Sequence, residues 1–424
     1  IQREVRPNPF LEALIALRER LLELREGPPR LFMSIFVSEE YDDNVFSEAE
    51  NRDDDFRTSI GVGTVFRYQR GRSFVSLSNS LRGNFSAHFP EQNDVAFANL
   101  ALNTGYQNPR WSVALNESLV RDDEPVQASP SGIRRERNVF LRNSISPQFR
   151  FAFTRRTSAN FAYTHTLVRD SDNSDSHTFS TGLQSRFTRR LNGSLGYSFN
   201  TASGEDAADS RAHRASGELS YIIGSQTSAT LQAFTTFTDR SNGGEDSQTT
   251  GMSLGLRRQL TEALGLFVSV GLTAFDPEGE GIRLFPNWQV NLDGTLPLFR
   301  TRRTTLTLSG SQNVADTRSE VDNIGIVSRQ TVNLSLNHLF SPRFRTSLFV
   351  TYSRTEDLED VGTAESERGR IDNFWTAGAN ASYLISDIFS FSLSYRHQRR
   401  DSNVEEDSDN NLVTATLSAG FSVF

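Results

Sequence analysis

The feature of this sequence that most constrains its fold is an alternation of apolar and polar residues that recurs along almost the whole chain. In "FSFSLSY", the residues Phe389, Phe391, Leu393 and Tyr395 alternate with three serines. Successive side chains of a strand point to opposite faces, so this period of two predicts strands with one apolar and one polar face. Of the 424 residues, 36% are hydrophobic, yet 32 are phenylalanines, and a disordered chain would be poor in aromatic residues.

The alternation predicts about 20 strands, within a range of roughly 18 to 22. Short turns that contain arginine, such as "TRRTS" at 154–158 and "TRRLN" at 188–192, alternate with long acidic segments such as 355–368. This rhythm is typical of an up-and-down meander. In outer-membrane barrels the short turns face the periplasm and the long loops face outside.

The apolar face of so many hairpins must be covered, either by other parts of the protein or by lipid. A soluble sheet of this length would leave either unpaired edges or an exposed apolar face, and a β-propeller would show a repeat of about 40 to 50 residues, which the sequence lacks. A barrel closed within a membrane pairs every strand and places lipid against the apolar face. We therefore predict an all-β fold: a transmembrane, antiparallel, up-and-down β-barrel in the outer membrane of a Gram-negative bacterium.

The first 30 residues are the exception, so we divide the chain into a segment at 1–30 and a barrel at 31–424. Residues 9–26 predict a short amphipathic helix, which Asn8 caps and Gly27 ends. Its apolar stripe is formed by Phe10, Leu14, Leu17, Leu21 and Leu24. Three partners are open for this stripe: the barrel lumen, a periplasmic protein or a second copy of the chain. We favour a protein partner or self-association, because a polar lumen matches an apolar stripe poorly.

Several other classes of protein are excluded. No run approaches the roughly 20 consecutive apolar residues of a membrane-spanning helix. Residue 1 opens no signal peptide, so we expect any export signal to have been removed already. The net charge of −8 argues against nucleic-acid binding, and the absence of cysteine fits an exported protein. The six histidines show no metal-ligand spacing and no nucleophile motif is present, so we predict neither an enzyme nor a cofactor.

The segment "FVSEEYDDNVF" at 36–46, which we place at the start of the first strand, carries a family motif. The matching residues are Tyr41, Asp42, Asp43, Asn44, Val45 and Phe46. They resemble the opening motif of the putative β-barrel porin 2 family, outer-membrane barrels that are often linked with exopolysaccharide export. The resemblance implies a barrel with no catalytic residues.

The polar face of the strands predicts what the lumen contains. If the apolar face meets lipid, the lumen-facing residues are small or polar, as in the series Asn160, Ala162, Thr164; Ser194, Gly196, Ser198, Asn200; and Thr331, Asn333, Ser335, Asn337. A barrel of this size holds water unless it is plugged. We therefore predict a porin-like channel for hydrophilic solutes or for polysaccharide export, with the N-terminal helix docking a periplasmic partner.

A structural role is the alternative. In it, the barrel anchors or sheathes an extracellular or electron-transfer assembly and conducts nothing. The expected partners are outer-membrane lipid and lipopolysaccharide, a periplasmic or extracellular protein, and further copies of the chain. The acidic loops either hold divalent cations beside lipopolysaccharide or carry solvated surface charge.

Overall fold

The computed structural model describes residues 27–46, 52–90, 94–122, 139–169, 173–204, 209–241, 246–277, 281–296, 304–316, 326–358, 369–404 and 406–423. These residues form one 20-stranded antiparallel sheet. Its strands are β1 (Gly27–Asp42), β2 (Asp55–Arg70), β3 (Ser73–Ser86), β4 (Asp94–Gln107), β5 (Trp111–Asp122), β6 (Phe140–Ala152), β7 (Thr157–Arg169), β8 (Ser174–Arg186), β9 (Leu191–Gly204), β10 (Ser210–Gly224), β11 (Thr227–Arg240), β12 (Ser247–Thr261), β13 (Leu264–Pro277), β14 (Arg283–Leu296), β15 (Thr304–Asp316), β16 (Ile326–Ser341), β17 (Phe344–Asp357), β18 (Ile371–Leu384), β19 (Phe389–Ser402) and β20 (Ser408–Ser422). In this part of the chain no helix is long and apolar enough to cross a membrane.

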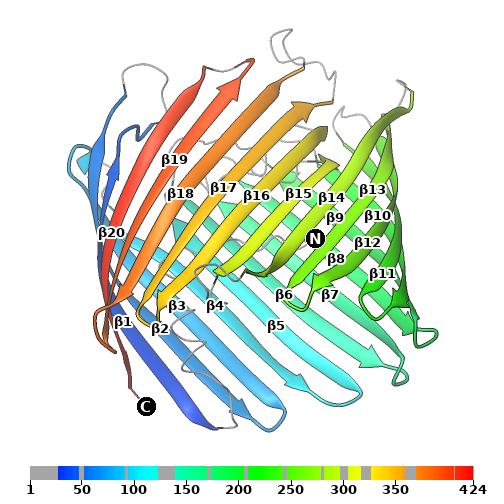
Figure 1. Cartoon of the computed structure of the whole chain (residues 1–424), viewed down its shortest axis with the longest axis horizontal. Helices are drawn as coiled ribbons and strands as arrows, with labels where there is room; N and C mark the ends of the chain where they lie inside the picture. Colours follow the sequence, from blue (N-terminus) through cyan, green and yellow to red (C-terminus); the bar gives the residue numbers. More distant parts are fainter. Residues whose placement is uncertain are drawn as a thin grey trace.

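The sheet closes on itself. Each strand pairs with the strands before and after it in the sequence, and β1 pairs with both β2 and β20. Figure 1 shows β20 beside β1 and the strands crossing the wall at a common tilt. The seam between β1 and β20 runs in register from Phe32 opposite Ser422 to Asp42 opposite Leu412. The predicted strand number and antiparallel closure are therefore confirmed.

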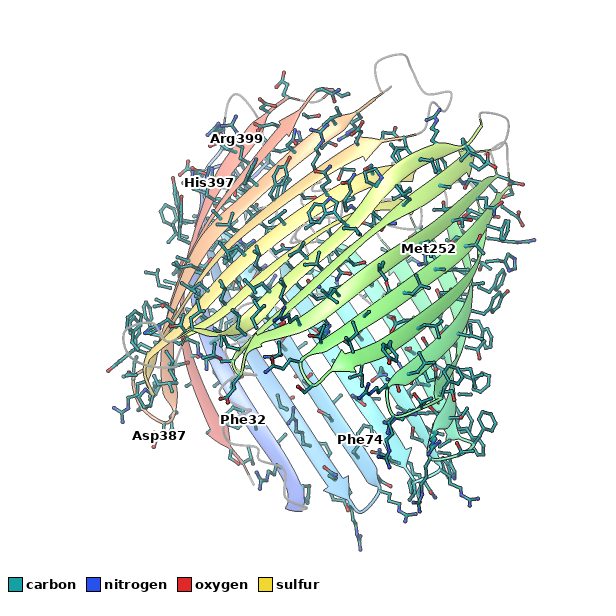
Figure 2. All side chains as sticks on the ribbon, turned by 45° about the vertical axis from the view of Figure 1, so that its right-hand side comes forward. Phe32, Phe74, Met252, Asp387, His397 and Arg399 are labelled. Carbon is teal, nitrogen blue, oxygen red and sulfur yellow. The ribbon has the colours of Figure 1, made fainter. Side chains whose placement is uncertain are left out.

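The barrel carries its hydrophobic side chains on the outside. Leu254 and Val270, neighbours on β12 and β13, are 59% and 60% exposed, and Met252 is seen on the outer side of the wall in Figure 2. Among the described residues, buried polar side chains outnumber buried hydrophobic ones. This arrangement is the reverse of a soluble protein and requires an apolar solvent around the wall.

The first strand begins earlier than the sequence predicted. We assigned residues up to 30 to the N-terminal segment, but β1 starts at Gly27. The register with β2 shifts between Gly27 and Arg30. Pro28 and Pro29 occupy this shift, where no backbone donor is needed. The predicted helix at 9–26, with the stripe that begins at Phe10, lies outside the described residues.

Two prolines inside strands are accommodated by gaps in the pairing rather than by bulges. The pairs of β6 with β7 pass from Ile145 to Gln148 without a register shift, so Pro147 is skipped. Pro286 pairs with Leu272 of β13, whereas the pairs of β14 with β15 begin only at Trp288. Each proline thus lies where a ladder is interrupted or has not begun, because it cannot donate a hydrogen bond.

Lumen-facing phenylalanines lie against glycines of the neighbouring strand. A β-carbon added at Gly61 would overlap the ring of Phe36, with which it is paired, and one at Gly378 would overlap the ring of Phe349. Phe74 and Gly105, and Phe234 and Gly251, are related in the same way, while Phe267 and Phe32 reach diagonally to Gly255 and Gly420. The rings cover the glycines and lie along the wall, which keeps the lumen wide and leaves its surface to polar groups.

We predict that Gly378→Ala destabilises the barrel by about 1–3 kcal/mol, because the new methyl group overlaps Phe349 and lies 2.7 Å from the carbonyl oxygen of Tyr395. Gly217→Ala is the matched control, since the nearest atom to its new methyl group is 3.5 Å away, and we expect a change below about 0.5 kcal/mol. Urea unfolding of the refolded protein in detergent micelles, followed by tryptophan fluorescence, measures both. Equal effects of the two substitutions would contradict the packing described here.

Candidate functional site

The residues predicted to line the lumen do face inward in the described strands. Val332 and Leu334 of β16 are exposed on the outer side, so Asn333 between them faces the lumen. Lumen-facing polar groups bond across strands: Thr178 donates to Asn200 at 2.7 Å, and the hydroxyl groups of Ser146 and Thr164 are 3.0 Å apart. The inner surface is therefore polar and hydrogen-bonded to itself.

Arginine dominates the charges of this inner surface, although the whole chain is acidic. The strand alternation and register place these arginines on the lumen side: Arg30, Arg57, Arg67, Arg82, Arg142, Arg150, Arg186, Arg214, Arg240, Arg257, Arg283, Arg329, Arg345, Arg396 and Arg400. The carboxylates on the same side are Glu40, Asp42, Asp55, Asp122, Glu218, Asp293, Asp357 and Asp372. The acidic surplus of the chain thus lies in the loops and on the outer surface, and the lumen wall is basic.

At the end that bears the long acidic loops, which we call the outer end, lumen charges are paired. Arg57 contacts Glu40 at 3.1 Å, and Arg82 contacts Asp122 at 2.6 Å. Arg370, just before β18, contacts Asp372 at 2.7 Å. Burial of an ion pair needs close geometry to offset desolvation, and Arg57 and Asp372 are buried. These pairs neutralise one another and fix the wall.

At the opposite, periplasmic end, a recess of about 940 Å³ opens beside the first and last residues of β6 to β9. Five arginines line it: Arg110, Arg150, Arg155, Arg156 and Arg186. Within the described residues none of these five forms an ion pair. The one carboxylate in the lining, Glu218, accepts a hydrogen bond from the Gln232 amide at 2.9 Å. The recess therefore carries a surplus of positive charge, five arginines against one carboxylate, and we call it the basic recess.

The local sequence explains why these arginines gather. In the turn between β6 and β7, the hydroxyl of Thr154 accepts hydrogen bonds from the backbone N–H groups of Arg156 and Thr157, both at 3.0 Å. Thr188 accepts the same two bonds in the turn between β8 and β9, from Arg190 at 3.1 Å and Leu191 at 2.9 Å. Side-chain to backbone bonds of this kind fix tight turns. The arginines that each turn presents are thereby held at the rim.

Two further arginines are held on aromatic rings above the glycines described above. The guanidinium carbon of Arg214 lies 4.1 Å from the centroid of Phe234, and that of Arg257 lies 5.4 Å from the centroid of Phe267. Each forms a stack of arginine, phenylalanine and glycine, which orients the cation along the wall. Positive charge therefore continues from the basic recess along the strands β10 to β13.

The family motif lies at the seam of the barrel, at the end of β1 and not at the start of a strand as the sequence suggested. Tyr41 and Asp42 are the last residues of β1, and Asp43 to Phe46 form the turn that follows. The Tyr41 ring lies 4.8 Å from that of Phe56, and the Phe46 ring meets Phe89 edge-on at 5.1 Å. The strand ends early because the backbone of this turn bonds to the opposite side of the seam.

The buried part of the motif grips the beginning of β20. The Asn44 side chain donates to the carbonyl oxygen of Asp409 at 2.8 Å, while its backbone N–H donates to the Asp42 carboxylate at 3.1 Å. Asn410 donates to the same Asp42 carboxylate and, at 3.3 Å, to the carbonyl oxygen of Asn44. Asp42, Asn44 and Asn410 are all at most 4% exposed.

Half-buried Asp43 and Asn411 complete this arrangement. Asp43 accepts from the backbone N–H of Asn411 at 2.6 Å and from its side-chain amide at 2.7 Å. The Tyr395 hydroxyl donates to the Asn411 amide oxygen at 2.8 Å. We call Asp42, Asp43, Asn44 and Asp409 to Asn411 the clasp. It joins residues more than 360 positions apart in the chain and closes the barrel at its outer end.

Sequence reasoning missed two clusters. For the basic recess the sequence does show the arginines of the short turns, but it does not show that the fold brings them together. The second cluster, His165, Asp175 and His177, comes together across the hairpin of β7 and β8 and has no signal in linear spacing. The docking residues predicted at Phe10, Leu14, Leu17, Leu21 and Leu24 lie outside the described residues.

Comparison with known proteins finds a family similarity over part of the chain. Residues 289–421 match the family model described as "Putative beta-barrel porin 2". The match runs from β14 to β20 and includes the β20 half of the clasp. It confirms the predicted resemblance to this porin family over these residues. The similarity to outer-membrane porins therefore rests on the last seven strands of the closed barrel.

Solved porin structures are similar to this chain at low identity. OccAB3 of Acinetobacter baumannii is 10% identical, with a TM-score of 0.42, over 93% of this chain and 99% of that chain. OpdO of Pseudomonas aeruginosa is 13% identical, with a TM-score of 0.45, over 93% and 98% of the two chains. OccAB4 of Acinetobacter baumannii is 10% identical, with a TM-score of 0.45, over 94% and 99%. These values say nothing about what this chain transports. None of the curated proteins matches the sequence.

We predict that Asn44→Ala lowers the stability of the barrel by about 1–3 kcal/mol, because it removes the fully buried amide that donates to the carbonyl oxygen of Asp409. Asn403→Ala is the matched control, since Asn403 also makes two hydrogen bonds, to Ile371 and Gly369, but is exposed. The control should change stability by less than about 1 kcal/mol. The temperature at which the folded band disappears in semi-native electrophoresis compares them, and a larger loss in the control would refute the role of the clasp.

Proposed function

We propose that this chain is a water-filled channel for hydrophilic anions, and that the basic recess is their binding site at the periplasmic end of the lumen. The observation that carries the proposal is the cluster of five arginines without a described ion-pair partner around one recess. Guanidinium groups bind carboxylate and phosphate oxygens through paired hydrogen bonds, so they suit organic acids, phosphates and acidic sugars alike.

The distribution of charge supports selection as well as binding. A cleft lined by charge of one sign raises the local concentration of the opposite ion and excludes ions of its own sign. The basic wall continues around the barrel to Arg257 on β12 and to Arg214, which lies nearer the outer end of β10. An anion that leaves the recess therefore meets further positive charge on its way to the outer end.

The lumen surface narrows the choice of cargo. Sugar rings are held in many sites by flat, exposed aromatic faces, but the lumen phenylalanines here cover glycines and lie along the wall. A neutral polysaccharide would find few stacking surfaces. Export of a polysaccharide, which the family resemblance implied, fits this lumen best when the polymer is acidic, because recognition then rests on arginine.

The N-terminal helix belongs to the same proposal. Its apolar stripe, from Phe10 to Leu24, fits a periplasmic protein partner better than a lumen lined by polar groups and arginine. In the alternative, the barrel is an anchor for an extracellular or electron-transfer assembly, and the helix docks that assembly. The two functions differ in conductance, since an anchor has no need of an open pore.

We expect the purified protein in planar bilayers to conduct with a reversal potential that shows preference for chloride over potassium in a KCl gradient. The double substitution Arg150→Gln and Arg186→Gln removes two charges from the basic recess and should lower the ratio of anion to cation permeability by roughly two-fold or more. The change in reversal potential measures this ratio directly.

The matched control removes the same charge from the outside of the barrel. Arg70 and Arg258 are exposed on the outer side of β2 and β12 near the same end, so Arg70→Gln with Arg258→Gln should leave the permeability ratio unchanged. Cation preference in the wild type would overturn the proposed anion selectivity. A folded barrel that never conducts would instead favour the anchoring role.

Removal of residues 1–26 tests the position of the helix. If the helix docks a periplasmic partner, the shortened protein should show the same conductance as the full chain, because the pore is already open. Single-channel recording measures both under identical salt. A clear increase in conductance on removal would show that the helix plugs the lumen and would refute the docking role.

A further inference from the structure

Three side chains with metal-binding atoms meet on the outer surface of the barrel, away from the lumen. His165 of β7 is paired with His177 of β8, and Asp175 is paired with Leu167 beside them. On the same side of these strands lie Tyr163 and Phe179, which are exposed at 40% and 43% among the hydrophobic side chains of the outer wall. The three residues are therefore outward-facing and lie one step beyond this aromatic level, towards the acidic loop that joins the two strands.

The ligand atoms of the three side chains converge. One atom from each of His165, Asp175 and His177 lies within 4.8 Å of the other two. His165 Nε2 is 2.8 Å from the Asp175 carboxylate, and His177 Nε2 is 3.5 Å from the same oxygen. With bond lengths of about 2.0–2.2 Å, two ligands of a tetrahedral zinc ion lie roughly 3.3–3.5 Å apart. The two distances to Asp175 lie on either side of this value or at it, and since all three ligand atoms lie within 4.8 Å of one another, changes of side-chain torsion angle would complete the site.

The two imidazole rings are held ready for this geometry. They are stacked with centroids 4.7 Å apart and an angle of 8° between their planes. Nδ1 of His177 lies 2.8 Å from the hydroxyl oxygen of Tyr163. A proton on Nδ1, donated to this oxygen, leaves Nε2 with its lone pair facing Asp175. Bonds of this type to the second ring nitrogen orient metal-binding histidines in known sites.

We propose that His165, Asp175 and His177 bind a divalent transition-metal ion of the zinc class at the outer edge of the barrel. Two imidazole nitrogens and one carboxylate oxygen suit zinc and its neighbours, whereas calcium and magnesium require oxygen ligands. Three protein ligands leave a fourth position open to solvent. This proposal is independent of the anion channel, because the site is on the opposite side of the wall from the lumen.

A second histidine on the same surface provides a matched comparison. His213 of β10 is also outward-facing, and its Nδ1 lies 2.9 Å from the Tyr197 hydroxyl, as His177 does from Tyr163. Within the described residues His213 belongs to no group of three metal-binding side chains. Among the described residues, a tyrosine hydroxyl contacts a histidine ring nitrogen at both places. Of these two, only the one on β7 and β8 also has a second histidine and a carboxylate within reach.

The test is zinc titration of the refolded, untagged protein in detergent micelles, with a chromophoric chelator as competitor. We expect one zinc ion per chain in the wild type. His165→Gln and His177→Gln should each weaken binding by more than the roughly 10- to 100-fold that loss of an outer partner costs, and Tyr163→Phe should fall within that range. His213→Gln should bind zinc as the wild type does.

Two results would overturn the proposed metal site. Heat-modified mobility in electrophoresis first establishes that every variant is folded. Zinc binding that is equal in the wild type and in the double variant of His165 and His177 would overturn the site and mark the metal as adventitious. A loss of thermal stability in these variants with no change in zinc affinity would also overturn it, because the cluster would then serve only to join β7 to β8.

Discussion

The pairing of β1 with β20 is the contact on which the rest of the structure depends. In a hydrocarbon solvent an unpaired strand edge exposes backbone N–H and C=O groups that find no water, so an open sheet is not viable there. Ladder hydrogen bonds alone would satisfy this requirement from Phe32 to Asp42. The clasp adds buried side-chain bonds at the point where the ladder ends, and Asn410 reaches both Asp42 and Asn44. A motif at one end of the chain therefore acts by recognising the other end, and this gives a physical reason for its position just after the first strand.

Closure also separates the charges of the chain into three environments. Acidic residues concentrate in the long loops, apolar residues face lipid and arginines line the lumen, so the net charge of −8 describes none of these surfaces. The charge of the lumen wall is positive, whereas the net charge of the chain is negative. In a soluble protein the sequence alone would not assign charged residues to one surface, but here strand alternation assigns each residue to one side of a wall that is a single layer thick. The charge that a solute meets can thus be obtained by following alternate residues.

The alternation in the sequence was sufficient for the strand number, the antiparallel order and the polar lumen, because each depends on residues two positions apart. It failed where function depends on distant partners. Asn44 contacts Asp409 only because the sheet closes, and His165 meets His177 only because a turn sets their register. The start of β1 was misplaced because two prolines after Gly27 are typical of a linker, although an interrupted ladder can accommodate them. Local pattern predicts which side of the wall a residue faces, whereas its neighbours around the barrel follow from the register.

The two ends of the lumen differ in whether their arginines are paired with carboxylates. At the outer end Arg57 is buried and paired with the largely covered Glu40, so that little of either charge faces a passing solute. At the periplasmic end Arg150 and Arg186 line an open recess without a carboxylate partner among the described residues. Five like charges in one recess repel one another, and only solvent or a bound anion offsets that repulsion. The lining holds one carboxylate, Glu218, for five arginines, whereas at the outer end each of the arginines Arg57, Arg82 and Arg370 has a carboxylate partner. This surplus of positive charge is therefore best explained by an anion that comes and goes.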